Sequence, residues 1–145
     1  MIKAIVKDPE VLSKVSEAVS SSDKDAEATL QDLIDTAMSY IDNCLGLAAV
    51  QIGVHKRIIV IRSGEGFIPM INPTIVKRSD TRDTMEEGCL SLEGTRKVTR
   101  PVRIEIMYQR KVGGKYIRQT VENADSLPFA RVIQHEIDHT KGVLI

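Results

Sequence analysis

The sequence has few cysteines, no surplus of charge and no long apolar run, and each shortage excludes a class of protein. Its two cysteines are too few for a disulfide-stabilised scaffold. Twenty basic and twenty acidic side chains cancel, which leaves no electrostatic footprint for a nucleic-acid backbone or an anionic membrane. No stretch approaches the roughly 20 apolar residues of a membrane span, and the opening MIKAIVKDPEVLSK lacks the apolar core of a secretory signal. We therefore expect a cytoplasmic protein with no direct nucleic-acid or membrane partner.

Length and composition predict one domain over residues 1–145. The chain is 42% hydrophobic, and a domain near this size buries about two-thirds of its unfolded surface. No repeat or linker divides it. Because no long apolar stripe would stay exposed once the main helices pack, we also expect a monomer.

Two helices are predicted in the first third of the chain. Asp8 and Pro9 fit the cap and first turn of a short helix that should extend to about Val15. Apolar residues then recur at helical spacing from Leu30 to Ile41, which predicts a helix of about four to five turns.

Strands and a final helix are predicted in the remainder. Gly64, Gly66 and Pro69 read as turn signals, and Gly113 with Gly114 predicts a hairpin turn. The strand candidates are Arg57–Ile61, Thr74–Val76, Val102–Tyr108 and Tyr116–Val121.

The final helix should carry the chain's main chemical motif. It is expected to begin near Asp125 or Ser126, with Pro128 in its first turn, and to end at Gly142. A helix over these residues places the HExxH motif near its C-terminal end.

The HExxH motif consists of His135, Glu136 and His139. On a helix, this spacing puts two imidazoles on one face with a carboxylate beside them, which suits a divalent metal. The alternative is a pair of exposed polar histidines. It is disfavoured because the chain has only three histidines and two of them form this pattern.

A catalytic metal site generally needs a third protein ligand and an open position for water. No further histidine follows in HEIDHTKGVLI, which argues against the metzincin arrangement. Upstream, Cys89 in EEGCLS offers a soft thiolate that suits iron or zinc. Because a lone cysteine is more often a small buried hydrophobe, its candidacy depends on the histidines.

The segment GLAAVQ, from Gly46 to Gln51, is a third candidate. It is expected to be a loop of small residues whose closing amide can donate hydrogen bonds to a developing oxyanion. The alternative is an ordinary connection between a helix and a strand, with the alanines packed inside.

In this order, GLAAVQ, EGCLS and QHEIDH resemble the three signature motifs of the peptide deformylase family, and KDPEVLSKVSE is similar to the family's opening helix. The resemblance implies an α+β fold, with antiparallel sheets packed around a central C-terminal HExxH helix and a long N-terminal helix. It implies a metal-dependent hydrolase that removes the formyl group from N-formyl-methionyl peptides or nascent chains and releases formate. The implied metal is one divalent ion per chain, natively Fe²⁺, with Zn²⁺, Ni²⁺ or Co²⁺ able to replace it.

The resemblance also assigns roles to individual residues. The implied metal ligands are Cys89, His135 and His139, with Glu136 as acid/base and with Gln51 and the Leu90 backbone N–H as stabilisers of the carbonyl oxygen. The implied substrate contacts are Gly46, Val132 and Arg96. Arg100 is a candidate partner for Glu87. For both arginines, the alternative is an exposed surface position.

The sequence departs from the family pattern at three positions. Cys44 replaces a usual glycine, so its side chain could narrow the substrate cleft and would be strained if the position required a positive φ. Glu93 and Thr140 replace a usual proline and leucine. These departures motivate an alternative, a deformylase-like metal-binding protein that holds formylated peptides with little turnover. A zinc peptidase with another third ligand ranks below it. Only three residues follow Gly142, so ribosome docking through a C-terminal extension is not expected.

Overall fold

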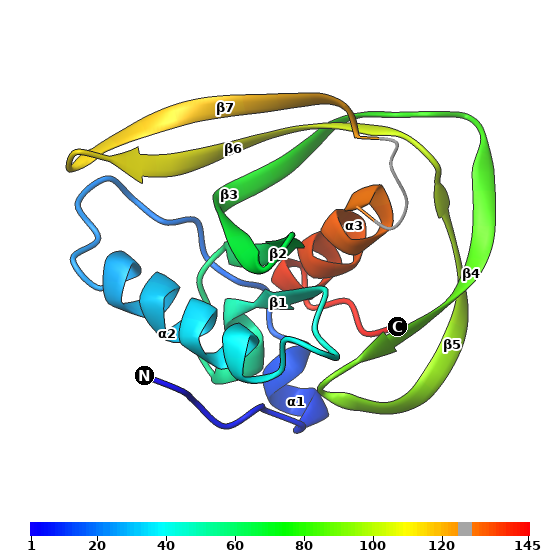
Figure 1. Ribbon diagram of the computed structural model, residues 1–145, viewed down its shortest axis with the longest axis horizontal. Helices are drawn as coiled ribbons and strands as arrows, with labels where there is room; N and C mark the ends of the chain where they lie inside the picture. Colours follow the sequence, from blue (N-terminus) through cyan, green and yellow to red (C-terminus); the bar gives the residue numbers. More distant parts are fainter. Residues whose placement is uncertain (125–128) are drawn as a thin grey trace.

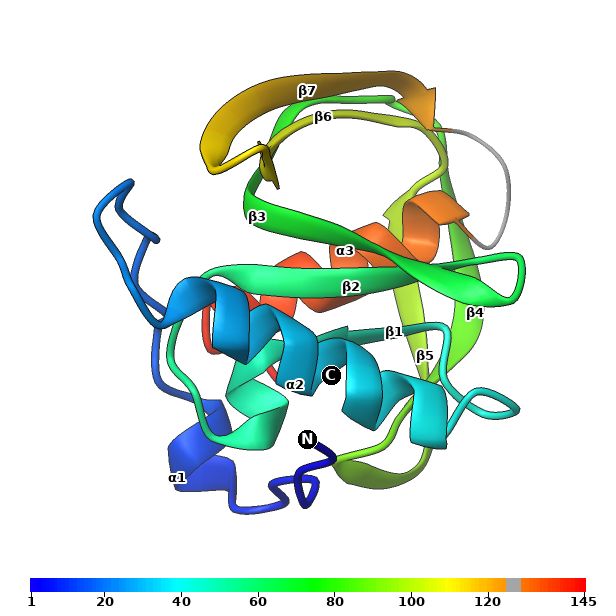
Figure 2. The same cartoon turned by 60° about the vertical axis from the view of Figure 1, so that its left-hand side comes forward.

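A five-stranded antiparallel sheet lies between two helices in a computed structural model that describes residues 1–124 and 129–145 (Figures 1 and 2). Its strand order is β1-β2-β3-β6-β7. The bounds are β1 (Gly46–Ala48), β2 (Ile58–Ser63), β3 (Gly66–Arg78), β6 (Ile104–Val112) and β7 (Lys115–Ala124). A separate two-stranded hairpin joins β4 (Arg82–Cys89) and β5 (Leu92–Pro101). The helices are α1 (Pro9–Leu12), α2 (Ala26–Ser39), the 3₁₀ helix η1 (Ala49–Ile52) and α3 (Phe129–Thr140).

Strand β2 is buried on both faces because helices cover both sides of the sheet. Ile58 and Val60 pack in the cluster that includes α2, whereas Ile59 and Ile61 pack in the cluster that includes α3. This double burial explains the unbroken apolar run that predicted a strand here. The α+β prediction, with antiparallel sheets around a C-terminal helix, is confirmed.

Both N-terminal helices were predicted in the right places but with wrong ends. Asp8 caps α1 by accepting a hydrogen bond from the backbone N–H of Glu10 at 3.0 Å, yet the helix ends at Leu12, and Val15 is 68% exposed. Helix α2 ends at Ser39, before Ile41. The apolar stripe does not mark these ends, because they are set by where the backbone hydrogen bonds stop.

Helix α3 ends at Thr140, and Gly142 just beyond it has the predicted left-handed conformation, with a φ of +73°. A Cβ atom there would lie 2.2 Å from the carbonyl oxygen of Ser13, so the glycine also lets the N-terminal segment approach. The predicted start of this helix, near Asp125 or Ser126 with Pro128 in the first turn, lies outside the described residues. None of the described helices combines the length and hydrophobicity needed to cross a membrane.

The strand predictions were right in position but incomplete. The Gly113–Gly114 turn between β6 and β7 is confirmed, and both glycines have positive φ. The predicted turn at Gly64 is confirmed, and Gly66 closes it as the first residue of β3, paired with Ser63. The interpretation of Pro69 as a turn residue was wrong, since it lies within β3. Pro69 pairs with Val60 of β2, whereas the pairing of β3 with β6 begins only at Ile71. The missing N–H of the proline therefore costs no hydrogen bond on the β6 side.

Hairpin β4–β5 was not predicted, although it carries Cys89. It runs beside α3, apart from the main sheet (Figure 1). Most of its side chains are exposed, and its few buried ones include the charged Glu87 and Arg100. An alternation of apolar and polar residues, which is the usual sign of a strand, is consequently weak here.

Candidate active site

The candidate metal ligands come from two different parts of the fold. Cys89 ends β4, while His135 and His139 lie one helical turn apart on α3. The two Nε2 atoms are 3.2 Å apart, and the Cys89 Sγ lies 3.5 Å from the Nε2 of His139. Around a tetrahedral ion with metal–nitrogen distances near 2.0–2.1 Å and a metal–sulfur distance near 2.3 Å, these separations would be about 3.3 and 3.5 Å. These two separations fit one small metal ion, and all three donor atoms lie within 4.8 Å of one another.

The two imidazoles differ in their protonation. The Nδ1 of His135 lies 3.0 Å from a Glu87 oxygen, an arrangement that turns the ring's Nε2 toward the other two donors. Burial and the neighbouring His135 lower the pKa of His139 to about 3, so this ring is neutral at pH 7. Burial also disfavours a charged His135, but Glu136, Cys89 and Glu87 outweigh it and raise its pKa to about 10. A binding metal would thus displace a proton.

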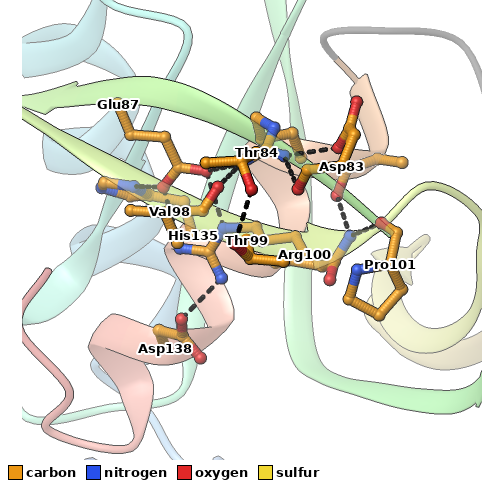
Figure 3. A network of polar contacts seen from close by, with 12 residues as sticks. Asp83, Thr84, Glu87, Val98, Thr99, Arg100, Pro101, His135 and Asp138 are labelled. Atoms are coloured by element: carbon orange, nitrogen blue, oxygen red, sulfur yellow. Dashed lines mark hydrogen bonds and ion pairs between the residues drawn. The ribbon is translucent and has the colours of Figure 1, made fainter. Parts of the chain in front are cut away.

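Glu87 is the centre of a buried ionic network (Figure 3). It accepts two hydrogen bonds from Arg100, at 2.7 and 2.8 Å, and one from Arg131 at 2.6 Å. Burial opposes its charge, but these arginines and His135 hold the pKa of Glu87 down at about 2. The predicted pairing of Arg100 with Glu87 is confirmed, and Arg100 also donates to Asp138 at 2.7 Å. The orientation of His135 is therefore fixed by a carboxylate that stays charged.

Glu136 is suited to moving a proton at neutral pH. Its side chain is 4% exposed, and burial raises its pKa to about 7. Its Oε1 has no hydrogen-bond partner among the described residues. A Cβ atom on Gly46 would lie 2.9 Å from the Oε2 of this carboxylate, so the glycine leaves room for it.

Gln51 presents its amide nitrogen to the site. Its Oε1 accepts a hydrogen bond from the backbone N–H of Ala48 at 3.0 Å. Its Nε2 donates to the Cys89 Sγ at 3.3 Å and to the Ser91 Oγ at 3.2 Å. The segment expected to be a loop is instead strand β1 followed by η1, and Ala48 and Ala49 are fully buried. The alanines are therefore packed inside, and the Gln51 amide nitrogen still points toward Cys89.

A cavity of about 470 Å³ opens beside these groups. Its lining includes most of the residues singled out from the sequence: Gly46, Gln51, Cys89, Leu90, Val132, His135 and Glu136. Arg96 does not line it and is exposed on β5, opposite Glu87 in the strand register. Sequence reasoning missed the lining residues Leu92 and Arg131. The only available signal for Arg131 was its position four residues before His135, on the same helix face.

Cys44 lies in the cavity wall without backbone strain. It is not among the described residues with positive φ, so the strain considered for this position does not arise. Its side chain is 2% exposed, and its thiol donates to the carbonyl oxygen of Gly46 at 3.3 Å. Burial, reinforced by the Glu136 charge, raises the pKa of Cys44 to about 12. The thiol is therefore protonated at neutral pH.

Comparisons with known proteins agree with this arrangement. The family model described as polypeptide deformylase matches residues 2–145. A peptide deformylase of Clostridium beijerinckii is 43% identical over 145 residues, covering all of both chains. The crystal structure of peptide deformylase from Thermotoga maritima superposes with a TM-score of 0.80 at 35% identity, covering 99% of this chain and 95% of that one. The Ehrlichia chaffeensis peptide deformylase in complex with actinonin gives 0.81 at 35% identity, covering 99% and 86%. The chain belongs to the peptide deformylase family.

Proposed function

We propose that this protein is a metal-dependent hydrolase that removes the formyl group from the N-formyl-methionyl end of newly made polypeptides and releases formate. The observation that carries the proposal is that one cysteine sulfur and two imidazole nitrogens lie within 4.8 Å of one another, beside a buried carboxyl and an open cavity. The relatives named peptide deformylase support the choice of reaction.

Cys89, His135 and His139 would hold the ion, which supplies a Lewis acid that lowers the pKa of a water molecule. Glu136 accepts a proton from the attacking water and donates it to the departing amine, so that the formyl C–N bond breaks without a covalent enzyme intermediate. A pKa near 7 suits both transfers.

Two donors stabilise the charge that develops on the formyl oxygen. The Gln51 amide is already oriented by its bonds to Ala48 and Ser91, so little reorganisation is needed when the oxygen becomes negative. The backbone N–H of Leu90 is the second donor, since Leu90 follows Cys89 directly and lines the cavity.

The methionine side chain of the substrate occupies the apolar part of the cavity. Val132 and Leu92 line it, and Gly46 gives the substrate backbone room to approach. Arg96 lies outside the cavity lining, so its contact is with peptide that extends beyond the cavity.

For the metal, Fe²⁺ is the proposed native ion, and Zn²⁺, Ni²⁺ or Co²⁺ can occupy the same ligands, because imidazole and thiolate bind all of them. The protein acts as a single domain over residues 1–145 and as a cytoplasmic monomer. Docking at the ribosome is not part of the proposal.

The alternative, a deformylase-like protein that binds formylated peptides with little turnover, is not favoured. It was motivated by Cys44, Glu93 and Thr140. Cys44 lies in the wall without strain and leaves the cavity open. Glu93 is exposed on β5, and Thr140 donates to the carbonyl oxygen of Ile137 within α3, so neither replaces a metal ligand. A zinc peptidase with another third ligand predicts that Cys89→Ala keeps its metal, whereas the proposed site predicts that metal is lost.

The test is formate release from a short N-formyl-methionyl peptide by protein purified anaerobically with Fe²⁺. The matched control is Glu136→Gln, which keeps the size of the side chain and removes its proton transfer. We expect the control to be slower by roughly 10²- to 10⁴-fold with its metal content unchanged. Wild-type protein that binds one metal per chain but releases no formate would refute the proposal.

A further inference from the structure

The candidate metal site is assembled from two parts of the fold that share no sheet. Helix α3 packs on the main sheet and supplies His135 and His139, whereas hairpin β4–β5 supplies Cys89. Among the described residues, the only buried apolar side chain of these two strands is Pro101, which pairs with Arg82 at the end of the hairpin far from Cys89. Apolar packing of the strands therefore does little to hold the thiolate at the imidazoles.

Arg131 makes polar contacts from α3 to both strands of the hairpin. Its side chain is 6% exposed, and it lies one helical turn before His135. On β4 it donates to the Asp83 carboxylate at 2.6 Å, to the Asp83 carbonyl at 3.0 Å and to Glu87 at 2.6 Å. On β5 it donates to the carbonyl oxygen of Val98 at 2.9 Å. One guanidinium thus joins the helix to both strands.

A second contact runs in the opposite direction. Arg100 of β5 donates to Asp138 of α3 at 2.7 Å, beside the bonds it makes to Glu87 (Figure 3). Asp138 lies nearer the C-terminal end of α3 than Arg131 does. Gln134 of α3 also donates to the carbonyl oxygen of Pro101 on β5 at 2.9 Å, and His135 itself contacts Glu87. Among these contacts, Arg131 is the side chain that bonds to both strands of the hairpin.

We propose that Arg131 is a positioning residue for the metal, which holds the hairpin that carries Cys89 against the helix that carries the two histidines. The inference rests on the proposed metal site. It adds that the metal affinity of this site depends on Arg131, which is not itself a ligand. The two bonds from Arg100 to Glu87 do not involve Arg131, so removing Arg131 should act mainly on the placement of the hairpin.

The experiment compares Arg131→Met with Arg82→Met as a matched control. Arg82 is an exposed arginine on the same hairpin, directly before Asp83. Zn²⁺ affinity is measured by competition with a chelator, and the thiolate-to-metal charge-transfer absorption is recorded with Co²⁺. For Arg131→Met we expect a roughly 10- to 100-fold weaker affinity, as for other outer-shell partners of metal ligands, and a weaker charge-transfer band. Arg82→Met should match the wild type in both.

The outcomes separate this inference from the proposed function. If the wild type binds no Zn²⁺, the proposed metal site fails and this inference fails with it. If the wild type binds and Arg131→Met binds equally tightly with the same charge-transfer band, the inference alone is overturned, even if this variant melts at a lower temperature. Should Arg131→Met not fold, Asp83→Asn replaces it, because it weakens one of the same contacts at a carboxylate whose side chain is 34% exposed. A several-fold weaker affinity in Asp83→Asn supports the inference, and wild-type affinity overturns it.

Discussion

Replacing Gly46 with alanine would test whether the space beside Glu136 is required for catalysis. A Cβ atom on Gly46 would lie 2.8 Å from a methyl carbon of Val132 and 2.9 Å from both the Cγ and the Oε2 of Glu136. Ordinary contacts between carbon atoms are about 3.5–4.0 Å, so the pairs must separate by at least about 0.6 Å. Glu136 is 4% exposed and lines the cavity, so its carboxyl can make room only by moving into the cavity, away from its position beside residue 46.

The expected cost falls on the rate more than on folding. Overpacking of this kind typically destabilises by about 1–3 kcal/mol. A 1 Å misplacement of a catalytic group can cost about 10²-fold, so a shift near 0.6 Å should lower kcat by roughly 10- to 100-fold. Metal content should stay at the wild-type level, because the alanine would press on Val132 and Glu136 and not on a ligand.

The assay is formate release as a function of peptide concentration, with metal content measured on the same samples. Gly66→Ala is the matched control, since Gly66 is also in a strand, does not have positive φ, and has no atom within 4 Å of its Cβ position. A wild-type kcat in Gly46→Ala would show that α3 can shift away from residue 46 without loss of rate. The close fit around Glu136 would then not be needed for catalysis.

Three further predictions concern stability and reactivity. Glu87 has a pKa of about 2 in the fold against an ordinary value of 4.5, so its stabilisation, at most about 3–4 kcal/mol, is present above pH 4.5 and is lost as the pH falls toward 2. Urea midpoints of metal-free protein should therefore fall less steeply below pH 4.5 in Glu87→Gln; an equally steep fall would refute this assignment. Gly142→Ala should lower the midpoint much more than Gly113→Ala, because both have positive φ but only Gly142 faces a backbone oxygen at 2.2 Å; equal losses would contradict the role of that contact. Cys44, with a pKa of about 12, should resist alkylation by iodoacetamide at pH 8 until the protein is denatured, as read by mass spectrometry; rapid labelling of the native protein would show that the thiol is accessible.

The sequence predicted the features that depend on local spacing. The two histidines four residues apart on one helix and the alternation of Ile104, Ile106 and Tyr108 were visible because helix and strand periodicities are local properties. The third donor, Cys89, lies far from the histidines in the chain. It became a candidate through its thiolate chemistry and the presence of the two histidines, and the resemblance to a family then assigned it as a ligand; periodicity gave no signal for it.

The features that were missed depend on tertiary contacts. Hairpin β4–β5 is fixed by ionic bonds to α3, so its strands lack the apolar alternation that would have predicted them. Arg131 had only its position on the helix as a signal, because arginines are usually exposed and its burial depends on Asp83 and Glu87 of the hairpin. The amide orientation of Gln51 likewise depends on Ser91, which is brought close only by folding.

The division of the ligands between a hairpin and a helix gives a bound metal a second consequence, as a cross-link. An ion held by Cys89 and His135 would close a loop of about 46 residues that includes β5, β6 and β7. By analogy with a disulfide across a loop of this length, such a closure would lower the conformational entropy of the unfolded chain and so raise the free energy of unfolding by about 4 kcal/mol. The ion that supplies the chemistry would then also hold together the halves of its own site, and its release would loosen the hairpin first.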